Sequence, residues 1–303
     1  MSEVASAAPF RHVVAGYDGS DGAAAAVAFA LWLAGKAGAE MTLLHACPSP
    51  GTPSHAAALP AVVDRRLTYE VEWQRRLEDL RDYGPAHATI HCRLGRGSPA
   101  GALIAAAAET DADLLLVGSR GAGPLRGALL GSVSSQLLAH APCSVMVFRE
   151  NAAPAPATQA STVLAGIDGS PSSSQALRLA QALAVLLRAK LVLVHAHDPD
   201  TPFLDGRTEA GREALRRSGH QLLHDARATV AAPLDVVEEE LVDGRAVEVL
   251  VEACERHSPA VLTLGSRGLG GFEGLLLGST SRGAAHHVSC PVLVARPKAA
   301  SVP

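Results

Sequence analysis

Two glycine-rich segments with identical spacing carry the clearest chemical signal in this 303-residue sequence. Both follow the pattern Gly-x-x-Gly, nine residues, then Gly-Ser, which occupies residues 118–132 in the first half and 265–279 in the second. Glycines at a strand end let backbone N–H groups approach an anion, and a serine that opens a helix can cap it and donate to a phosphate oxygen. The spacing therefore predicts a phosphate cradle in each half.

An aspartate followed by Gly-Ser also occurs twice, as Asp18 and Asp168. Alone, such a residue is better explained as part of a turn or a helix cap. Opposite a glycine loop on a neighbouring strand, the balance shifts toward a carboxylate that accepts hydrogen bonds from ribose hydroxyls. His45 and His195 are interpreted as packing residues at strand ends, because no repeated Ser or Cys partner completes a nucleophilic triad. We assign no catalytic residue.

Composition excludes several other classes of function. A net charge of −4 with only 2 Trp, 3 Tyr and 5 Phe supplies neither the basic field nor the stacking surfaces of a nucleic-acid binder. The histidines lack metal-ligand spacing and the five cysteines lack a C-x-x-C pair, so no metal site is expected except Mg²⁺ carried by a nucleotide. The arginine pairs of the predicted second helices fit solvated faces.

The chain repeats itself once, and the repeat defines its domains. Residues 14–20 recur as 164–170 at an offset of 150, and from Leu116 onward the offset becomes 147. Between the copies, a stretch rich in proline and alanine is typical of an extended linker. We predict a first domain at 1–150, a linker at 151–161 and a second domain at 162–303.

Short apolar runs that alternate with helical patterns must position these residues, and they predict parallel sheets. The strands of the first copy are expected at 12–17, 41–46, 87–93, 113–118 and 144–148, and its helices at 21–37, 62–83, 98–109 and 132–140. The strands of the second copy are expected at 162–167, 190–196, 234–241, 260–265 and 291–295. All these strands are expected to be apolar on both faces. The fold class is α/β, with two doubly wound parallel five-stranded sheets in tandem.

These motifs together resemble the universal stress protein family, as a tandem pair. The glycine pattern, the aspartate after the first strand and the His-Ala pair after the second carry the resemblance, which covers nearly the whole chain. The resemblance implies the strand order 3-2-1-4-5 of the adenine nucleotide alpha hydrolase-like fold. It also implies membership of the subclass that binds ATP, a role in nucleotide-linked stress regulation, and pairing of domains through the last strand.

The family pattern implies two sets of nucleotide-binding residues. In the first copy they are Asp18, Ala46, Val117, Gly118, Arg120, Gly121, Gly131, Ser132, Val133 and Ser134. In the second copy they are Asp168, Ala196, Leu264, Gly265, Arg267, Gly268, Gly278, Ser279, Thr280 and Ser281. Several family members have a bulkier β-branched residue where Ala46 and Ala196 stand, which predicts a roomier adenine pocket here.

The expected function is regulatory ATP binding at two sites, and the alternative is an interaction scaffold of the same fold without nucleotide. An ATP-consuming enzyme is disfavoured because neither loop contains a lysine. The longest apolar run, at 23–34, is too short to span a bilayer, and the N-terminus is acidic, so we expect a cytoplasmic protein. The partners expected are an adenine nucleotide, an unidentified protein and a second copy in a homodimer. The apolar last strands, 144–148 and 291–295, are expected to pair because exposed edges aggregate.

Overall fold

The computed structural model describes residues 10–47, 62–121, 130–149, 161–198, 208–231, 234, 236–268 and 277–297. Within 62–121, the side chains are described from Leu67 onward. The chain forms two compact units, Met1–Ala155 and Pro156–Pro303. The predicted linker lies outside the described residues except for Ser161, as do 122–129 and 269–276 within the two glycine loops.

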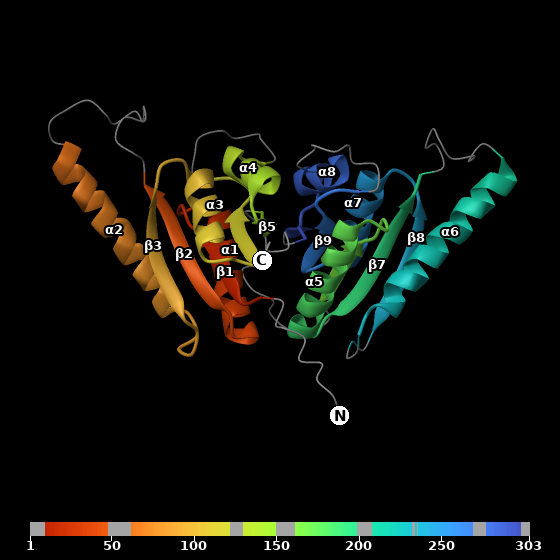
Figure 1. Ribbon diagram of the computed structural model, residues 1–303, viewed down its shortest axis with the longest axis horizontal. Helices are drawn as coiled ribbons and strands as arrows, with labels where there is room; N and C mark the ends of the chain where they lie inside the picture. Colours follow the sequence, from red (N-terminus) through yellow and green to blue (C-terminus); the bar gives the residue numbers. More distant parts are fainter. Residues whose placement is uncertain are drawn as a thin grey trace, which may run out of the picture. The chain divides into compact units, whose positions relative to one another are not determined.

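Unit 1 alternates strands and helices as the sequence predicts (Figure 1). Its elements are β1 (His12–Gly16), α1 (Asp21–Ala37), β2 (Glu40–Cys47), α2 (Val62–Asp82), β3 (Ile90–Arg96), α3 (Pro99–Glu109), β4 (Leu114–Gly118), α4 (Ser132–His140) and β5 (Ser144–Phe148). All strands are parallel, in the order β3-β2-β1-β4-β5. Helices α1 and α2 cover one face of the sheet, and α3 and α4 cover the other.

Unit 2 repeats this plan. Its elements are β6 (Thr162–Gly166), α5 (Pro171–Leu187), β7 (Lys190–His197), α6 (Glu209–Ala228), β8 (Val237–Asp243), α7 (Ala246–His257), β9 (Val261–Gly265), α8 (Ser279–His287) and β10 (Val292–Ala295). The strands run parallel in the order β8-β7-β6-β9-β10. The α/β class, the tandem arrangement and the implied 3-2-1-4-5 order within each unit are therefore confirmed.

The central strand of each unit is buried on both sides and fixes the register of its neighbours. In β1, Val13 is fully buried and lies opposite Met41 of β2 and Leu114 of β4. In β6, Val163 takes the same place between β7 and β9. Because the strands are parallel, the carboxyl ends of β1, β2 and β4 meet at one edge, where ligands of doubly wound sheets bind.

The turn after each central strand is built by local capping. In unit 1, Gly19 has a φ of +84°, and the Ser20 side chain caps α1 by accepting a hydrogen bond from the Ala23 N–H. In unit 2, Ser170 caps α5 in the same way. These caps begin both helices beside the glycine loops and hold the preceding aspartates in place.

The edge strands depart from the predicted positions. Strand β3 begins at Ile90 instead of residue 87, because residues 85–88 form a turn closed by the Ala88 N–H and the Pro85 carbonyl (2.9 Å). It then continues to Arg96, which pairs with Cys47 of β2. Strand β8 likewise begins at Val237 instead of 234. The expectation that every strand is apolar on both faces is wrong for these two, because edge strands are covered by fewer neighbours and carry charged residues.

An ion pair joins each edge strand to the helix that follows it, and the two pairs have opposite polarity. In unit 1, Arg93 of β3 bonds Glu109 of α3 at 2.5 Å. In unit 2, Glu240 of β8 bonds Arg256 of α7 at 2.7 Å. The positions correspond, because Arg93 lies opposite Leu44 and Glu240 lies opposite its repeat equivalent Val194. The two copies thus keep the contact with the charges exchanged.

Candidate functional site

Unit 1 has a cavity of about 310 Å³ at the carboxyl ends of β1, β2 and β4. All ten residues predicted for the first copy line it: Asp18, Ala46, Val117, Gly118, Arg120, Gly121, Gly131, Ser132, Val133 and Ser134. These residues come from four separate segments of the chain. The fold therefore brings the predicted set together in one place, with a volume at the lower end of the range for small-molecule sites.

Asp18 takes part both in a helix-capping turn and in the cavity wall. Its Oδ1 accepts hydrogen bonds from the Ser20 N–H (3.0 Å) and the Ser20 hydroxyl (2.6 Å). Its Oδ2 lies so close to Gly121 that a Cβ at that position would be 2.6 Å from it. Gly121 thus allows the glycine loop to pass against the carboxylate. The capping and the cavity-facing interpretations of Asp18 apply to different oxygens of one side chain.

Gly118 is required by the packing of β4 against α1. A Cβ there would lie 2.7 Å from the Ala23 nitrogen and 2.9 Å from the Gly22 carbonyl carbon, both of which are backbone atoms that cannot move aside. This close approach places the end of β4 directly beside the start of α1. It therefore brings the glycine loop next to the Asp18 turn.

The second part of the loop differs from the prediction in one respect. Ser132 does not cap α4, because Gly131 is the N-cap residue (φ −79°) and no side chain caps the helix. Ser279 and Gly278 (φ −68°) stand in the same relation to α8. The Gly131 N–H itself donates a hydrogen bond to the Ser119 carbonyl (2.7 Å) and is therefore not free to bind an anion. The donors that α4 turns toward the cavity are therefore the N–H groups of its first residues, where a helix attracts anions.

Ser134 contributes to the site through structure. Its hydroxyl, almost fully buried, donates to the carbonyl oxygens of Ser119 (2.8 Å) and Gly131 (3.1 Å). In unit 2 the Ser281 hydroxyl donates to the Gly265 carbonyl at 2.5 Å. Both serines tie the start of the helix to the end of the preceding strand. Their hydroxyl protons already have acceptors within the protein.

Unit 2 repeats the arrangement around its own aspartate. The Asp168 Oδ1 accepts from the Ser170 N–H (2.9 Å), and a Cβ on Gly268 would be 2.7 Å from Oδ2. The Gly278 N–H donates to the Ser266 carbonyl at 2.7 Å, as Gly131 does to Ser119. The other predicted residues lie at the ends of β7 and β9, in the loop and in the first turn of α8: Ala196, Leu264, Gly265, Arg267, Ser279, Thr280 and Ser281.

The two units differ at the start of the helix that packs against the glycine loop. Where unit 1 has Gly22, unit 2 has Ser172, whose hydroxyl donates to the Arg267 carbonyl. A Cβ on Gly265 would be 2.5 Å from that hydroxyl oxygen. The serine therefore adds a side-chain bond between α5 and the loop that unit 1 does not have.

An aromatic cluster that was not predicted lies beside the cavity of unit 1. His45, which lines the cavity, stacks on Trp73 of α2 with ring centroids 3.6 Å apart and an interplanar angle of 3°. Its Nδ1 is 2.8 Å from the Tyr17 carbonyl and its Nε2 is 2.9 Å from the Tyr69 hydroxyl. A signal was present, because Tyr69 and Trp73 are four residues apart on one helix, and Tyr17 and His45 lie at the ends of the two neighbouring strands β1 and β2.

Burial sets the protonation state of this cluster. It lowers the pKa of His45, an effect that the hydrogen bond to the Tyr17 carbonyl and the Asp18 charge only partly oppose. A carbonyl can only accept, so Nδ1 carries the proton and the neutral Nε2 accepts from the Tyr69 hydroxyl. Burial likewise raises the pKa of Tyr69. His45 is thus a neutral bridge that ties the ends of β1 and β2 to α2. In unit 2, the Nδ1 atom of His195 repeats the contact of His45 with Tyr17, at 2.7 Å from the Ile167 carbonyl.

An apolar wall of the cavity was also not predicted. The additional apolar lining residues include Leu44, Pro99, Leu103 and Leu130. Pro99 and Leu103 come from the first turns of α3. The sequence predicted this helix but not that its first turns line the cavity. This wall can hold a flat apolar ring, while the Asp18 and glycine-loop walls offer hydrogen bonds to polar groups.

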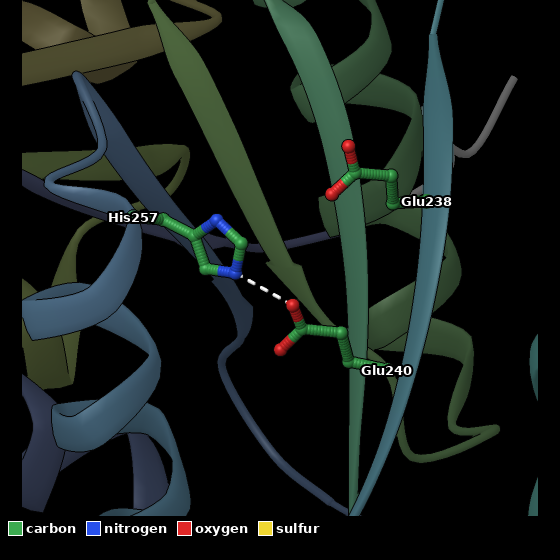
Figure 2. Close-up of side chains that lie close together, drawn as sticks. All are labelled: Glu238, Glu240 and His257. Atoms are coloured by element: carbon green, nitrogen blue, oxygen red, sulfur yellow. Dashed lines mark hydrogen bonds and ion pairs between the residues drawn. The ribbon is translucent and has the colours of Figure 1, made fainter.

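A second group of chemically capable side chains lies on β8 and α7. Figure 2 shows Glu238, Glu240 and His257 facing one another, and one ligand atom of each lies within 4.8 Å of the others. His257 Nε2 is 2.6 Å from Glu240 Oε1 (Figure 2). This group was not predicted, because its residues come from two elements and lack a metal-binding spacing.

The carboxylates of this group already have cationic partners. Lys190 bonds Glu238 at 3.1 Å, and Arg256 bonds Glu240 at 2.7 Å. Burial alone would raise the pKa of Glu240, but hydrogen bonds from Arg256 and His257 outweigh it and hold that pKa below its usual value. The group is therefore balanced in charge as it stands.

The fold and the loops define a tandem α/β protein with a glycine loop beside the central strand of each domain. Comparison with known proteins agrees. A model of the universal stress protein family matches residues 9–149 and 160–296. The chain therefore belongs to the universal stress protein family, with one family domain in each half.

Two relatives and one solved structure illustrate the likeness. Universal stress protein Rv2623 of Mycobacterium tuberculosis is 30% identical over 298 residues, which cover 94% of this chain and 96% of that protein. Universal stress protein Rv2005c of the same organism is 36% identical over 192 residues, 62% of this chain and 63% of that protein. The crystal structure of a universal stress protein from Archaeoglobus fulgidus DSM 4304 is 19% identical, with a TM-score of 0.69, and covers 97% of this chain and 100% of that one. This last likeness concerns the fold.

Among the described residues, no helix is both long enough and apolar enough to cross a membrane.

Proposed function

We propose that this protein is a cytoplasmic, ATP-binding regulator of the stress response, with one nucleotide site in each unit. The observation that carries the proposal is the cavity of unit 1. All ten residues predicted for its copy of the motif line this cavity, although they come from four separate segments of the chain. Unit 2 repeats the aspartate, the loop and the start of the following helix with similar contacts.

The walls of the cavity match the three parts of the ligand. The apolar wall around Leu44, Leu103 and Val117 suits a purine ring, and the Ala46 backbone at the end of β2 is the place for contacts to its edge. The Asp18 carboxylate suits the ribose hydroxyls. The glycine loop and the first N–H groups of α4 suit the phosphates, with Mg²⁺ as a companion of the nucleotide.

We assign a regulatory role because the sequences of the two glycine loops lack one residue on which phosphoryl transfer depends. Neither glycine loop contains a lysine, which nucleotide-hydrolysing loops use to stabilise the transferring phosphate. His45, the imidazole at the cavity, has both ring nitrogens within hydrogen-bond distance of protein groups. We expect hydrolysis to be slow and incidental.

Assembly through the last strands is part of the proposal. Strands β5 and β10 are the terminal strands of their sheets within each unit, and both consist almost wholly of apolar residues. Pairing of such strands, within a chain or in a homodimer, would remove aggregation-prone edges.

The test is direct. Purified full-length protein is denatured, and released nucleotide is identified by chromatography; apo protein is then titrated with Mg-ATP by calorimetry. We expect saturable binding with two sites per chain. If no nucleotide is released and millimolar ATP gives no heat, the protein is a scaffold of the same fold, which is the alternative function.

A further inference from the structure

Two buried cysteines of unit 2 are in contact. Cys254 lies in the last turns of α7, and Cys290 lies between α8 and β10. Their sulfur atoms are 3.7 Å apart, with the Cys290 thiol donating to the Cys254 sulfur. Cys254 is 3% exposed and Cys290 is 9% exposed, so the second thiol is nearer to solvent.

Unit 1 has only half of this arrangement. The repeat places Ala107 where unit 2 has Cys254, and Cys143 where it has Cys290. Both residues are buried in unit 1, so the packing of the site is kept without the second sulfur. The thiol pair is therefore a property of unit 2 that the fold itself does not require.

We propose that Cys254 and Cys290 form a reversible dithiol–disulfide pair that hydroperoxides oxidise. The sulfurs must approach from 3.7 Å to about 2.05 Å, which side-chain rotation and a small shift of α7 can supply. The cross-link would join α7 to the segment that leads into β10. Unit 2 would thus contain an oxidant-sensitive connection that is missing from unit 1.

The chemistry balances in two steps. The Cys290 thiolate attacks the peroxide oxygen, which breaks the O–O bond, leaves a sulfenic acid on Cys290 and releases water or an alcohol. The Cys254 thiol then loses its proton and attacks the Cys290 sulfur; the S–S bond forms, the S–O bond of the sulfenic acid breaks, and the hydroxide leaves with that proton as water. The two thiols together lose two protons and two electrons, and the peroxide gains them.

The surroundings assign the order of attack. The hydrogen bond with Cys290, together with burial, raises the pKa of the Cys254 thiol. Cys254 is therefore a poor first nucleophile, whereas the more exposed Cys290 can meet the oxidant. Because the thiolate is the reactive form, we expect oxidation to be slower than that of an exposed cysteine.

The experiment uses the full chain, reduced with dithiothreitol, desalted and treated with hydrogen peroxide. Remaining thiols are alkylated under denaturing conditions, and tryptic peptides are mapped by mass spectrometry. We expect two of the five thiols to be lost, a linked pair of peptides 246–256 and 283–298 whose mass is two hydrogens below their sum, and recovery of both thiols with fresh dithiothreitol.

The repeat supplies matched variants. Cys254→Ala copies the residue of unit 1 and should abolish the linked peptides, and Cys143→Ala should leave them unchanged. The proposal is overturned if both cysteines of the wild type remain alkylatable after peroxide treatment. It is equally overturned if they are oxidised to sulfinic acids or to disulfides with other cysteines. The wild-type peptide map decides this even if a variant folds poorly.

Discussion

Replacing Gly121 by alanine tests whether the Asp18 carboxylate is a ligand contact. The new Cβ would lie 2.6 Å from Asp18 Oδ2, whereas ordinary contacts begin at 3.4 Å, so the carboxylate must retreat by about 0.8 Å. A displacement of that size stretches a 2.8 Å hydrogen bond beyond the range in which it counts as one. Gly121 has no positive φ, and Asp18 is a flexible side chain, so the fold should tolerate the change.

The expected loss follows from the strength of a charged hydrogen bond. Such a bond contributes about 1.5–3 kcal/mol, and each 1.4 kcal/mol corresponds to about tenfold in affinity. We expect Gly121→Ala to weaken ATP binding at the site of unit 1 by about 10- to 100-fold, while the site of unit 2 binds normally. Titration calorimetry with Mg-ATP measures both sites, and Gly268→Ala is the matched variant for unit 2.

A double-mutant cycle separates this mechanism from a direct clash with the ligand. If Gly121→Ala acts by moving the carboxylate, it should cost nothing further in a chain that already carries Asp18→Ala. The melting temperature of each variant checks that the Ser20 cap and α1 remain intact. Additive losses would show that the alanine meets the ligand itself, and undiminished affinity in Gly121→Ala would refute the role of Asp18.

Three other predictions concern the ligand, the loop and the aromatic cluster. Mg-ATP at about 100 times its dissociation constant should stabilise the folded chain by roughly 2.7 kcal/mol, seen as a higher melting temperature, and no shift would contradict nucleotide binding. Gly131→Val and Gly278→Val add bulk without backbone strain, because both φ values are negative. Each variant should halve the ATP bound per chain and leave the circular dichroism spectrum unchanged. Normal stoichiometry would mean that these glycines only form turns. The lowered pKa of His45 means that the unfolded chain binds the proton more tightly, so stability should be complete above pH 6.5 and decline as the pH falls below it toward the folded pKa. His45→Gln should flatten this decline in melts between pH 7.5 and 5, and an equally steep decline in that variant would exclude His45 as its origin.

The features that the sequence predicted are those encoded by neighbouring residues. The helix start at Asp21 follows from the serine before it, and the buried strands follow from unbroken apolar runs. Strand β3 was misplaced because its extension to Arg96 depends on pairing with β2, which no local pattern reports. A strand at the sheet edge also lacks the apolar run that marks a central one.

In the candidate site, too, local sequence patterns predicted some features, and contacts between distant residues determined the others. The glycine spacing locates Gly121 and Gly131, but it does not reveal that the Gly131 N–H is used by Ser119. The capping role expected for Ser132 was wrong, because helix α4 begins at Ser132 itself, one residue earlier than a cap at that serine requires. The stacking of His45 on Trp73 joins residues 28 positions apart and became visible only in three dimensions.

The exchanged ion pairs of the two edge strands have a consequence for how a duplicated chain folds correctly. Two nearly equivalent units in one polypeptide risk exchanging helices during folding, a known failure of repeated domains. If α3 packed against β8, Glu109 would meet Glu240, and if α7 packed against β3, Arg256 would meet Arg93. Only the native pairing brings opposite charges together. The polarity of this contact therefore favours packing of each helix against its own sheet.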